Sequence, residues 1–135
     1  MNDAVNFKFT REIFTNTVRF RLLSNGIIHY TYLPNVEVDI KEHQINHDTL
    51  IQLADKNQKA LLLIDADEFI NVTSEARKFI RTLEPHVPIK ARALVITSLG
   101  QRILASFYIR VQKPIVETKI FNNYADAFSW LNTLK

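Results

Sequence analysis

Alternating polar and apolar positions near the start of the chain predict an antiparallel hairpin. In residues 17–24, arginines alternate with apolar side chains, which is the two-residue period of a half-buried strand. Asn25-Gly26 follows, a dipeptide strongly preferred in two-residue hairpin turns, and residues 27–33 resume the strand pattern. A further strand is expected before this hairpin, within residues 4–14.

Three later segments are expected to form strands. Residues 60–65 (ALLLID) and 91–98 (ARALVITS) are typical of strands covered on both faces, as in a parallel sheet. Residues 116–121 (VETKIF) are expected to form a last short strand. We expect Leu61–Ile64 and Leu94–Ile96 to lie side by side at the centre of the sheet.

Four other segments have apolar residues at helical spacing. The first covers about residues 40–57, where Asp39 as N-cap and Glu42 three residues later have the spacing of a capping box. The positions expected to face the sheet are Ile40, Leu50, Ile51 and Ala54 in this helix, Ala76, Phe79, Ile80 and Leu83 in the helix at 73–83, Ile103, Leu104, Phe107 and Val111 in the helix at 99–112, and Tyr124, Ala127, Leu131 and Leu134 in the last helix.

The order of elements is therefore hairpin, helix, strand, helix, strand, helix, strand and helix. Buried strands that alternate with amphipathic helices predict a mainly parallel sheet with helices layered over it. The expected fold class is an α/β sandwich with an N-terminal antiparallel hairpin and about four helices. We expect a single domain over residues 1–135, with a core at about 17–135.

Composition narrows the functional classes. The chain has 135 residues, no cysteine and a formal net charge of +3, and its charged residues are scattered. Disulfides and thiolate chemistry are excluded, and the sequence lacks the concentrated basic stripe that binds nucleic acid. It also lacks a secretory signal and an apolar run of membrane-spanning length. We expect a cytoplasmic protein with no nucleic-acid partner and no stable membrane insertion.

Several short motifs carry a resemblance to a known family. They are LLLID at 61–65, SEAR at 74–77, ALVITS at 93–98, KP at 113–114 and the closing KIFNNYADAFSWL at 119–131. With these motifs in this order, residues 17–135 resemble the STAS superfamily, in particular its small SpoIIAA-like bacterial members. The resemblance implies a STAS-type α/β fold and a non-enzymatic regulatory role with a protein partner, without catalytic residues or a cofactor.

In the anti-sigma-factor-antagonist branch of that superfamily, a partner kinase phosphorylates a serine in an Asp-Ser-Ser-Gly turn before the second helix. The corresponding turn here is Thr73-Ser74-Glu75-Ala76, with alanine in place of glycine and Glu75 nearest the phosphoserine position. Thr73 and Ser74 are the candidate phosphorylation sites, Ser74 in a register shifted by one residue. A plain helix N-cap is the competing and favoured interpretation of this hydroxyl pair.

Asp65, Asp67 and Glu68 form an acidic cluster at the carboxyl end of the expected central strand. Open α/β sheets bind ligands at this edge, and paired carboxylates suit Mg²⁺. A magnesium-dependent phospho-acceptor at Asp65 or Asp67 is therefore one alternative. Solvated loop carboxylates are the favoured interpretation.

His43 and His47 are four residues apart and share one side of the first helix. This spacing is compatible with zinc, but a third protein ligand is not identifiable in the sequence. No metal site is expected, and the pair is interpreted as two histidines at the margin of an amphipathic helix.

Basic residues accumulate on the second and third expected helices. They are Arg77, Lys78, Arg81, Arg102, Arg110 and Lys113, and Phe107-Tyr108 lies among them. If the two helices are neighbours, this surface suits an acidic partner or a lipid headgroup. Arg77 opposes the helix dipole in the first turn, so we expect it to pair with Asp67 or Glu68.

The favoured function is accordingly a non-catalytic, regulatory protein-interaction module of STAS type. Docking is expected through residues 66–77 and the helix at 99–112, with modification at Thr73 or Ser74. The interaction candidates are Asp67, Glu68, Glu75, Arg77 and Arg102. The alternative is a module that binds a small acidic ligand or a lipid headgroup through its basic helix faces. A homodimer is compatible with sheet edges that carry little protecting charge.

Overall fold

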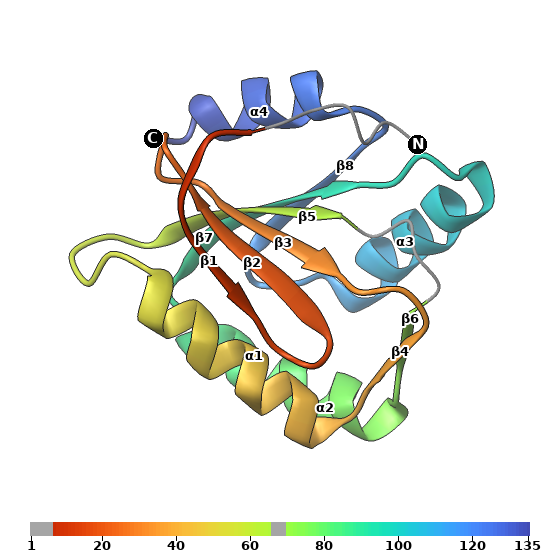
Figure 1. The fold of residues 1–135 in the computed structure, drawn as a ribbon. Helices are drawn as coiled ribbons and strands as arrows, with labels where there is room; N and C mark the ends of the chain where they lie inside the picture. Colours follow the sequence, from red (N-terminus) through yellow and green to blue (C-terminus); the bar gives the residue numbers. More distant parts are fainter. Residues whose placement is uncertain (1–6, 66–69) are drawn as a thin grey trace.

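The structure, a computed structural model, describes residues 7–65 and 70–135, and these form a six-stranded sheet with a separate two-stranded sheet beside it (Figure 1). The strands are β1 (Phe9–Phe14), β2 (Val18–Leu23), β3 (Ile28–Tyr32), β4 (Val36–Val38), β5 (Ala60–Asp65), β6 (Ile70–Val72), β7 (Ile89–Val95) and β8 (Glu117–Phe121). The helices are α1 (Ile40–Leu53), α2 (Ser74–Leu83), α3 (Leu99–Gln112) and α4 (Tyr124–Asn132), and a 3-10 turn at Glu84–His86 follows α2.

The large sheet has the strand order β1-β2-β3-β5-β7-β8. Pairing is antiparallel from β1 to β3 and parallel from β3 to β8. The β2–β3 hairpin turns at Asn25-Gly26, where Gly26 has a φ of +90°. Ile64 of β5 lies opposite Leu94 of β7. The predicted α/β class, the hairpin and the central parallel pair are confirmed, and β1 is the additional strand expected within residues 4–14.

Each face of the sheet has its own apolar core. One core contains Phe20 and Leu62 and is covered by α1. The other contains Leu63 and is covered by α4, whose Ala127 and Leu131 are fully buried. Figure 1 shows α1 and α2 on one side of the sheet and α4 on the other. Neighbouring residues of β5 thus belong to opposite cores, which explains its continuous apolar run.

The first helix is shorter than predicted and is rotated about its axis. It ends at Leu53 rather than at residue 57, because the chain turns where Asp55 Oδ1 accepts the amide of Asn57 at 2.8 Å. Ile40 and Ile51 were predicted to face the sheet, but both are exposed.

Buried Asn46 explains the rotation of α1. Asn46 Nδ2 donates to Thr17 Oγ1 at 2.8 Å, and Asn46 Oδ1 accepts from the Thr15 hydroxyl at 2.6 Å. A buried amide must be paired in this way, so Asn46 has to face the start of the hairpin. The buried stripe of α1 consequently runs through Asn46, Leu50 and Leu53.

Two short parallel strands that the sequence analysis missed bring the starts of α1 and α2 together. In the β4–β6 pair, Val38 lies opposite Val72. The Thr73 amide donates to the Val38 carbonyl at 3.0 Å, and the Thr73 hydroxyl donates to Asp39 Oδ1 at 2.8 Å. The expected capping contact of α1 also forms, since the Asp39 amide donates to Glu42 Oε1 at 2.9 Å. The N-caps of the two helices are therefore bonded to each other.

The third helix departs furthest from the prediction. Ile103, Leu104, Phe107 and Val111 were expected to face the sheet, but the exposed fractions of these residues are 57–70%. No residue of α3 is buried. The prediction was wrong because helical spacing shows which side of a helix is apolar, and it does not show whether that side faces the sheet or solvent.

Candidate functional site

The outer side of α3 presents a continuous apolar stripe to solvent. Its members share one side of the helix and are each 40–70% exposed: Leu99, Ile103, Leu104, Phe107, Tyr108 and Val111. The half-buried residues of the opposite side include Ala105 and Ile109. Contiguous exposed apolar side chains of this kind mark binding surfaces in soluble proteins. We call these six residues the α3 stripe, and it is the main candidate for a docking site.

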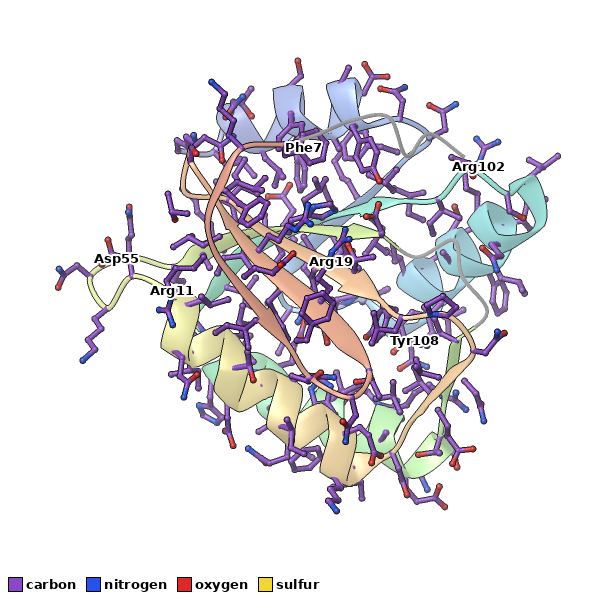
Figure 2. All side chains as sticks on the ribbon, in the orientation of Figure 1. Phe7, Arg11, Arg19, Asp55, Arg102 and Tyr108 are labelled. Carbon is purple, nitrogen blue, oxygen red and sulfur yellow. The ribbon has the colours of Figure 1, made fainter. Side chains whose placement is uncertain are left out.

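Charges on α3 are all basic. The helix contains Arg102 and Arg110, its C-cap is Lys113, and the sequence of Leu99–Gln112 has no aspartate or glutamate. At 100° per residue, Arg102 and Arg110 fall along one border of the stripe. Figure 2 marks Arg102 and Tyr108 on this helix. The docking candidate is therefore both apolar and electropositive.

The second half of α3 lies beside α2, and a hydrogen bond joins the two helices. Arg81 of α2 donates to the Gln112 side chain at 2.7 Å. A cavity of about 330 Å³ lies between the two helices, lined by Arg81, Gln112, Glu84, Arg92 and several apolar residues. Glu84 accepts two hydrogen bonds from Arg92, at 2.8 and 2.9 Å, and one from the Val116 amide at 3.1 Å. Burial alone would raise the pKa of Glu84, but these bonds outweigh it and lower the pKa.

A groove of about 520 Å³ runs along the first half of α3. It is lined by Leu99, Arg102, Ile103, Ser106 and Arg110 from α3, by Ile120 and Phe121 from β8, by Asn122 from the turn after β8, and by Asp126 from α4. Among the described residues, the buried Nε of Arg102 has no hydrogen-bond partner. The groove thus places two guanidinium groups, one carboxylate and several apolar side chains at the edge of the α3 stripe.

Asp65 is the centre of a second, polar cluster at the carboxyl end of β5. The Tyr124 hydroxyl donates to Asp65 Oδ1 at 2.6 Å, the Thr31 hydroxyl donates to Oδ2 at 3.0 Å, and His29 Nε2 lies 2.7 Å from Oδ2. Sheet register places Thr31 directly opposite Asp65. The sequence analysis missed His29, Thr31 and Tyr124, which lie 34–59 residues from Asp65 along the chain. The register of β3 against β5 would have connected His29 and Thr31 with Asp65, whereas Tyr124 is brought there by the packing of α4.

The contacts of Asp65 hold its carboxylate in place and keep it ionised. Burial alone would raise the pKa of Asp65, but the hydrogen bond and charge of His29 and the hydrogen bonds of Tyr124 and Thr31 outweigh burial and lower the pKa. Both carboxylate oxygens already accept bonds from the protein. Among residues 7–65 and 70–135, no cluster of three His, Cys, Asp or Glu side chains is arranged to hold a metal ion. Asp67 and Glu68 lie outside the described residues.

Thr73 and Ser74, the candidate phosphorylation sites, differ sharply in their surroundings. The Thr73 hydroxyl accepts the Ala76 amide at 3.0 Å and donates to Asp39, so it serves as the N-cap of α2. The bond from Thr73 also lowers the pKa of Asp39. Ser74 is exposed, and its hydroxyl donates to Glu75 Oε1 at 3.3 Å. The accessible hydroxyl of this turn is therefore that of Ser74.

The interaction candidates in the described part of the chain are Glu75, Arg77 and Arg102, and they lie on two helices, with the exposed Glu75 in the first turn of α2. Arg77 is on α2, where its guanidinium donates to the Val72 carbonyl at 2.6 Å. Its expected partners, Asp67 and Glu68, are outside the described residues, and within residues 7–65 and 70–135 Arg77 forms no ion pair. Arg102 lines the groove beside α3.

The histidine pair lies at the contact between α1 and α2. The ring of His43 packs edge-on against Phe79, with 6.1 Å between the ring centroids. Burial, followed by the charges of His47 and Arg92, lowers the pKa of His43 to about 4. His43 is thus a neutral packing residue at ordinary pH.

Comparisons with known proteins concern the fold and the family. The chain is similar to an uncharacterised protein of the DUF3478 family from Shewanella loihica PV-4, whose crystal structure has a SpoIIAA-like fold. The TM-score is 0.56 at 14% identity, with 97% of this chain and 98% of that chain covered. This similarity confirms the SpoIIAA-like fold. No helix in the described part of the chain has the length and apolar character needed to cross a membrane.

A search of curated proteins finds no match. The model of a family described as a domain of unknown function, DUF7793, matches residues 21–135, which is most of the chain. The chain therefore belongs to the DUF7793 family.

Proposed function

We propose that the protein is a non-catalytic regulatory module of STAS type that works by docking through the α3 stripe. The observation that carries this proposal is the 40–70% exposure of the apolar side of α3, a helix that contributes no buried residue to the fold. A helix that leaves six large side chains in water loses the stabilisation that their burial would provide. Docking of a partner would recover that burial.

Asp65, the best candidate for catalysis in the described residues, supports the same proposal. A phospho-acceptor or a metal ligand needs a carboxylate oxygen that faces its substrate or ion. Both oxygens of Asp65 instead accept hydrogen bonds from within the fold. We therefore place function on the outer surface of α3 and assign Asp65 to the attachment of α4 and β3 to the end of β5.

Regulation would act at Ser74 rather than at Thr73. A phosphate on Thr73 would remove the hydrogen donor to Asp39 and place negative charge beside that carboxylate. A phosphate on Ser74 would lie in the first turn of α2, where free amides and the helix dipole favour anions. Ser74 is exposed, so a partner kinase can reach it.

Site-specific photo-crosslinking in producing cells tests the docking proposal. A photoreactive amino acid replaces Leu104 in the α3 stripe in one variant, and it replaces Ser129, exposed on α4, in the matched control. Docking predicts adducts at position 104 that are absent at position 129 and that weaken when Phe107→Ser is added. Identical adduct patterns at the two positions would contradict the proposal. The adduct mass tells whether protein or lipid was captured.

A further inference from the structure

We propose that the surface docked by the α3 stripe is that of an anionic lipid bilayer, on which α3 lies flat at the headgroup level. This inference rests on the docking function proposed above and names its partner. Three properties of the described residues support it: the composition of the stripe, the sign of the charges around it, and the groove along its border.

The composition of the stripe is that of a helix lying at a membrane interface. Such helices combine an apolar side rich in leucine and aromatic residues with a cationic border. The α3 stripe has Phe107 and Tyr108 at its centre and aliphatic residues on either side along the helix. Tyrosine suits this depth because its ring is apolar and its hydroxyl stays in contact with water. With 14 residues, α3 offers an apolar edge about 20 Å long.

Cations border the stripe on both sides. Arg102 and Arg110 follow one border, and the Gln112 border is occupied by Arg81 of α2. Arg77 and Lys78 are exposed on the same neighbouring helix. Basic residues held near an anionic membrane surface each strengthen binding several-fold, and the attraction is screened by salt.

The same charges make a second copy of this chain a poorer partner. A twofold interface brings one surface against itself, so Arg102 and Arg110 would meet like charges across it. Protein interfaces also tend to exclude charge from their centre. A bilayer with acidic headgroups instead accepts apolar side chains below a layer of negative charge, which matches the arrangement around α3.

The groove beside α3 fits a phosphodiester headgroup. It contains the guanidinium groups of Arg102 and Arg110, the hydroxyl of Ser106 and the side chain of Asn122, and the two cations outnumber its single carboxylate, that of Asp126. The Nε of Arg102 is buried and has no partner among the described residues, so the guanidinium group of Arg102 is not held by a hydrogen bond through that atom. Guanidinium groups bind phosphate oxygens through paired N–H donors. An acidic phospholipid can thus place its headgroup in the groove while its acyl region meets the α3 stripe.

Co-sedimentation with vesicles tests this inference on the full chain. The probes are phosphatidylcholine vesicles with and without about one-third phosphatidylglycerol, at low and at high salt. We expect binding to the anionic vesicles that falls about tenfold or more in high salt, and little binding to pure phosphatidylcholine. Leu104→Ser with Phe107→Ser should abolish binding and leave the thermal unfolding midpoint nearly unchanged, because both side chains are already exposed.

A charge-matched pair of variants separates a specific face from general attraction. Arg102→Gln with Arg110→Gln should weaken anionic-vesicle binding by about tenfold or more. Lys56→Gln with Lys59→Gln removes the same charge from an exposed turn and should change it by less than about twofold. Figure 2 shows Asp55, next to this turn, on the opposite side of the molecule from Arg102.

The outcomes distinguish failure of this inference from failure of the docking function. Equal losses in the two charge variants would overturn the membrane inference, as would the absence of binding to anionic vesicles. If vesicles do not bind but Leu104 crosslinks to a protein, docking stands with a protein partner. If position 104 also gives no specific adduct, both proposals fall.

Discussion

Helices α3 and α4 are amphipathic helices that precede and follow β8 along the chain, yet they have opposite roles in the fold. In α4, Ala127 and Leu131 are fully buried against the sheet. In α3, the residues at equivalent spacing are exposed, and the contacts with its surroundings include a hydrogen bond between Arg81 and Gln112. The same sequence pattern therefore serves folding in one helix and remains available for binding in the other.

Truncating one leucine in each helix should give the largest contrast. Leu131→Ala would leave a cavity in the core under α4 and lower the free energy of unfolding by about 3 kcal/mol. Leu104→Ala removes a side chain that is 70% exposed, so its effect should stay within about 0.5 kcal/mol. Urea denaturation of both variants measures the difference. Similar losses would mean that α3 packs into a core after all.

The pH dependence of stability should reveal a difference between the packed α1–α2 contact and α3. The change in the free energy of unfolding should be somewhat smaller than the loss expected for Leu131→Ala. The pKa of His43 is about 4 in the folded protein and 6.5 in its reference state, so only the unfolded chain takes up this proton between those values. Stability contributed at His43 is complete above pH 6.5 and is lost as pH falls toward 4, with about 2 kcal/mol lost by pH 5. Denaturation at pH 7 and pH 5 measures the loss.

His43→Gln should flatten this part of the pH profile, and His86→Gln, at an exposed residue, should leave it as in the parent protein. A profile that is unchanged by His43→Gln would assign the dependence to other groups. Asp65 and Glu84, whose pKa values are also lowered, contribute to the loss of stability at still lower pH.

The smallest effect is expected at the start of α2. Thr73→Ala removes the N-cap bond to Ala76 and the bond to Asp39, and should cost about 1 kcal/mol of unfolding free energy. Ser74→Ala at the neighbouring exposed position should be nearly neutral for stability and should abolish phosphate incorporation by a partner kinase. Thermal unfolding and phosphopeptide mapping measure the two effects. Phosphate found on Thr73 instead of Ser74 would contradict this division of roles.

Local signals in the sequence were sufficient for most of the fold. The Asn25-Gly26 turn and the apolar runs at 60–65 and 91–98 each depend on neighbouring residues, and each predicted element is present. Strands β4 and β6 were missed because a three-residue strand is too short to show a period of apolar and polar positions. The rotation of α1 was missed because it depends on Asn46 and its partners in the hairpin.

The candidate sites required information that periodicity does not contain. The spacing of apolar residues correctly identified the α3 stripe as one side of a helix. The error was to expect that the sheet covers this side, which is exposed to solvent. The partners of Asp65 come from β3 and α4, and His29 in particular has no local feature that marks it. The basic residues of α2 and α3 were predicted to share a surface if the two helices are neighbours. The hydrogen bond between Arg81 and Gln112 shows that α2 and α3 are neighbours.

Because α3 buries no residue of its own, its outer surface is uncoupled from the requirements of folding. Substitutions among the stripe residues can alter what the molecule recognises at little thermodynamic risk, whereas changes at Leu131 or Asn46 would endanger the native state first. Relatives of this chain can thus acquire different binding targets through substitutions in a single helix while the rest of the fold is unchanged. The same separation makes α3 a practical place for engineers to graft new binding sequences.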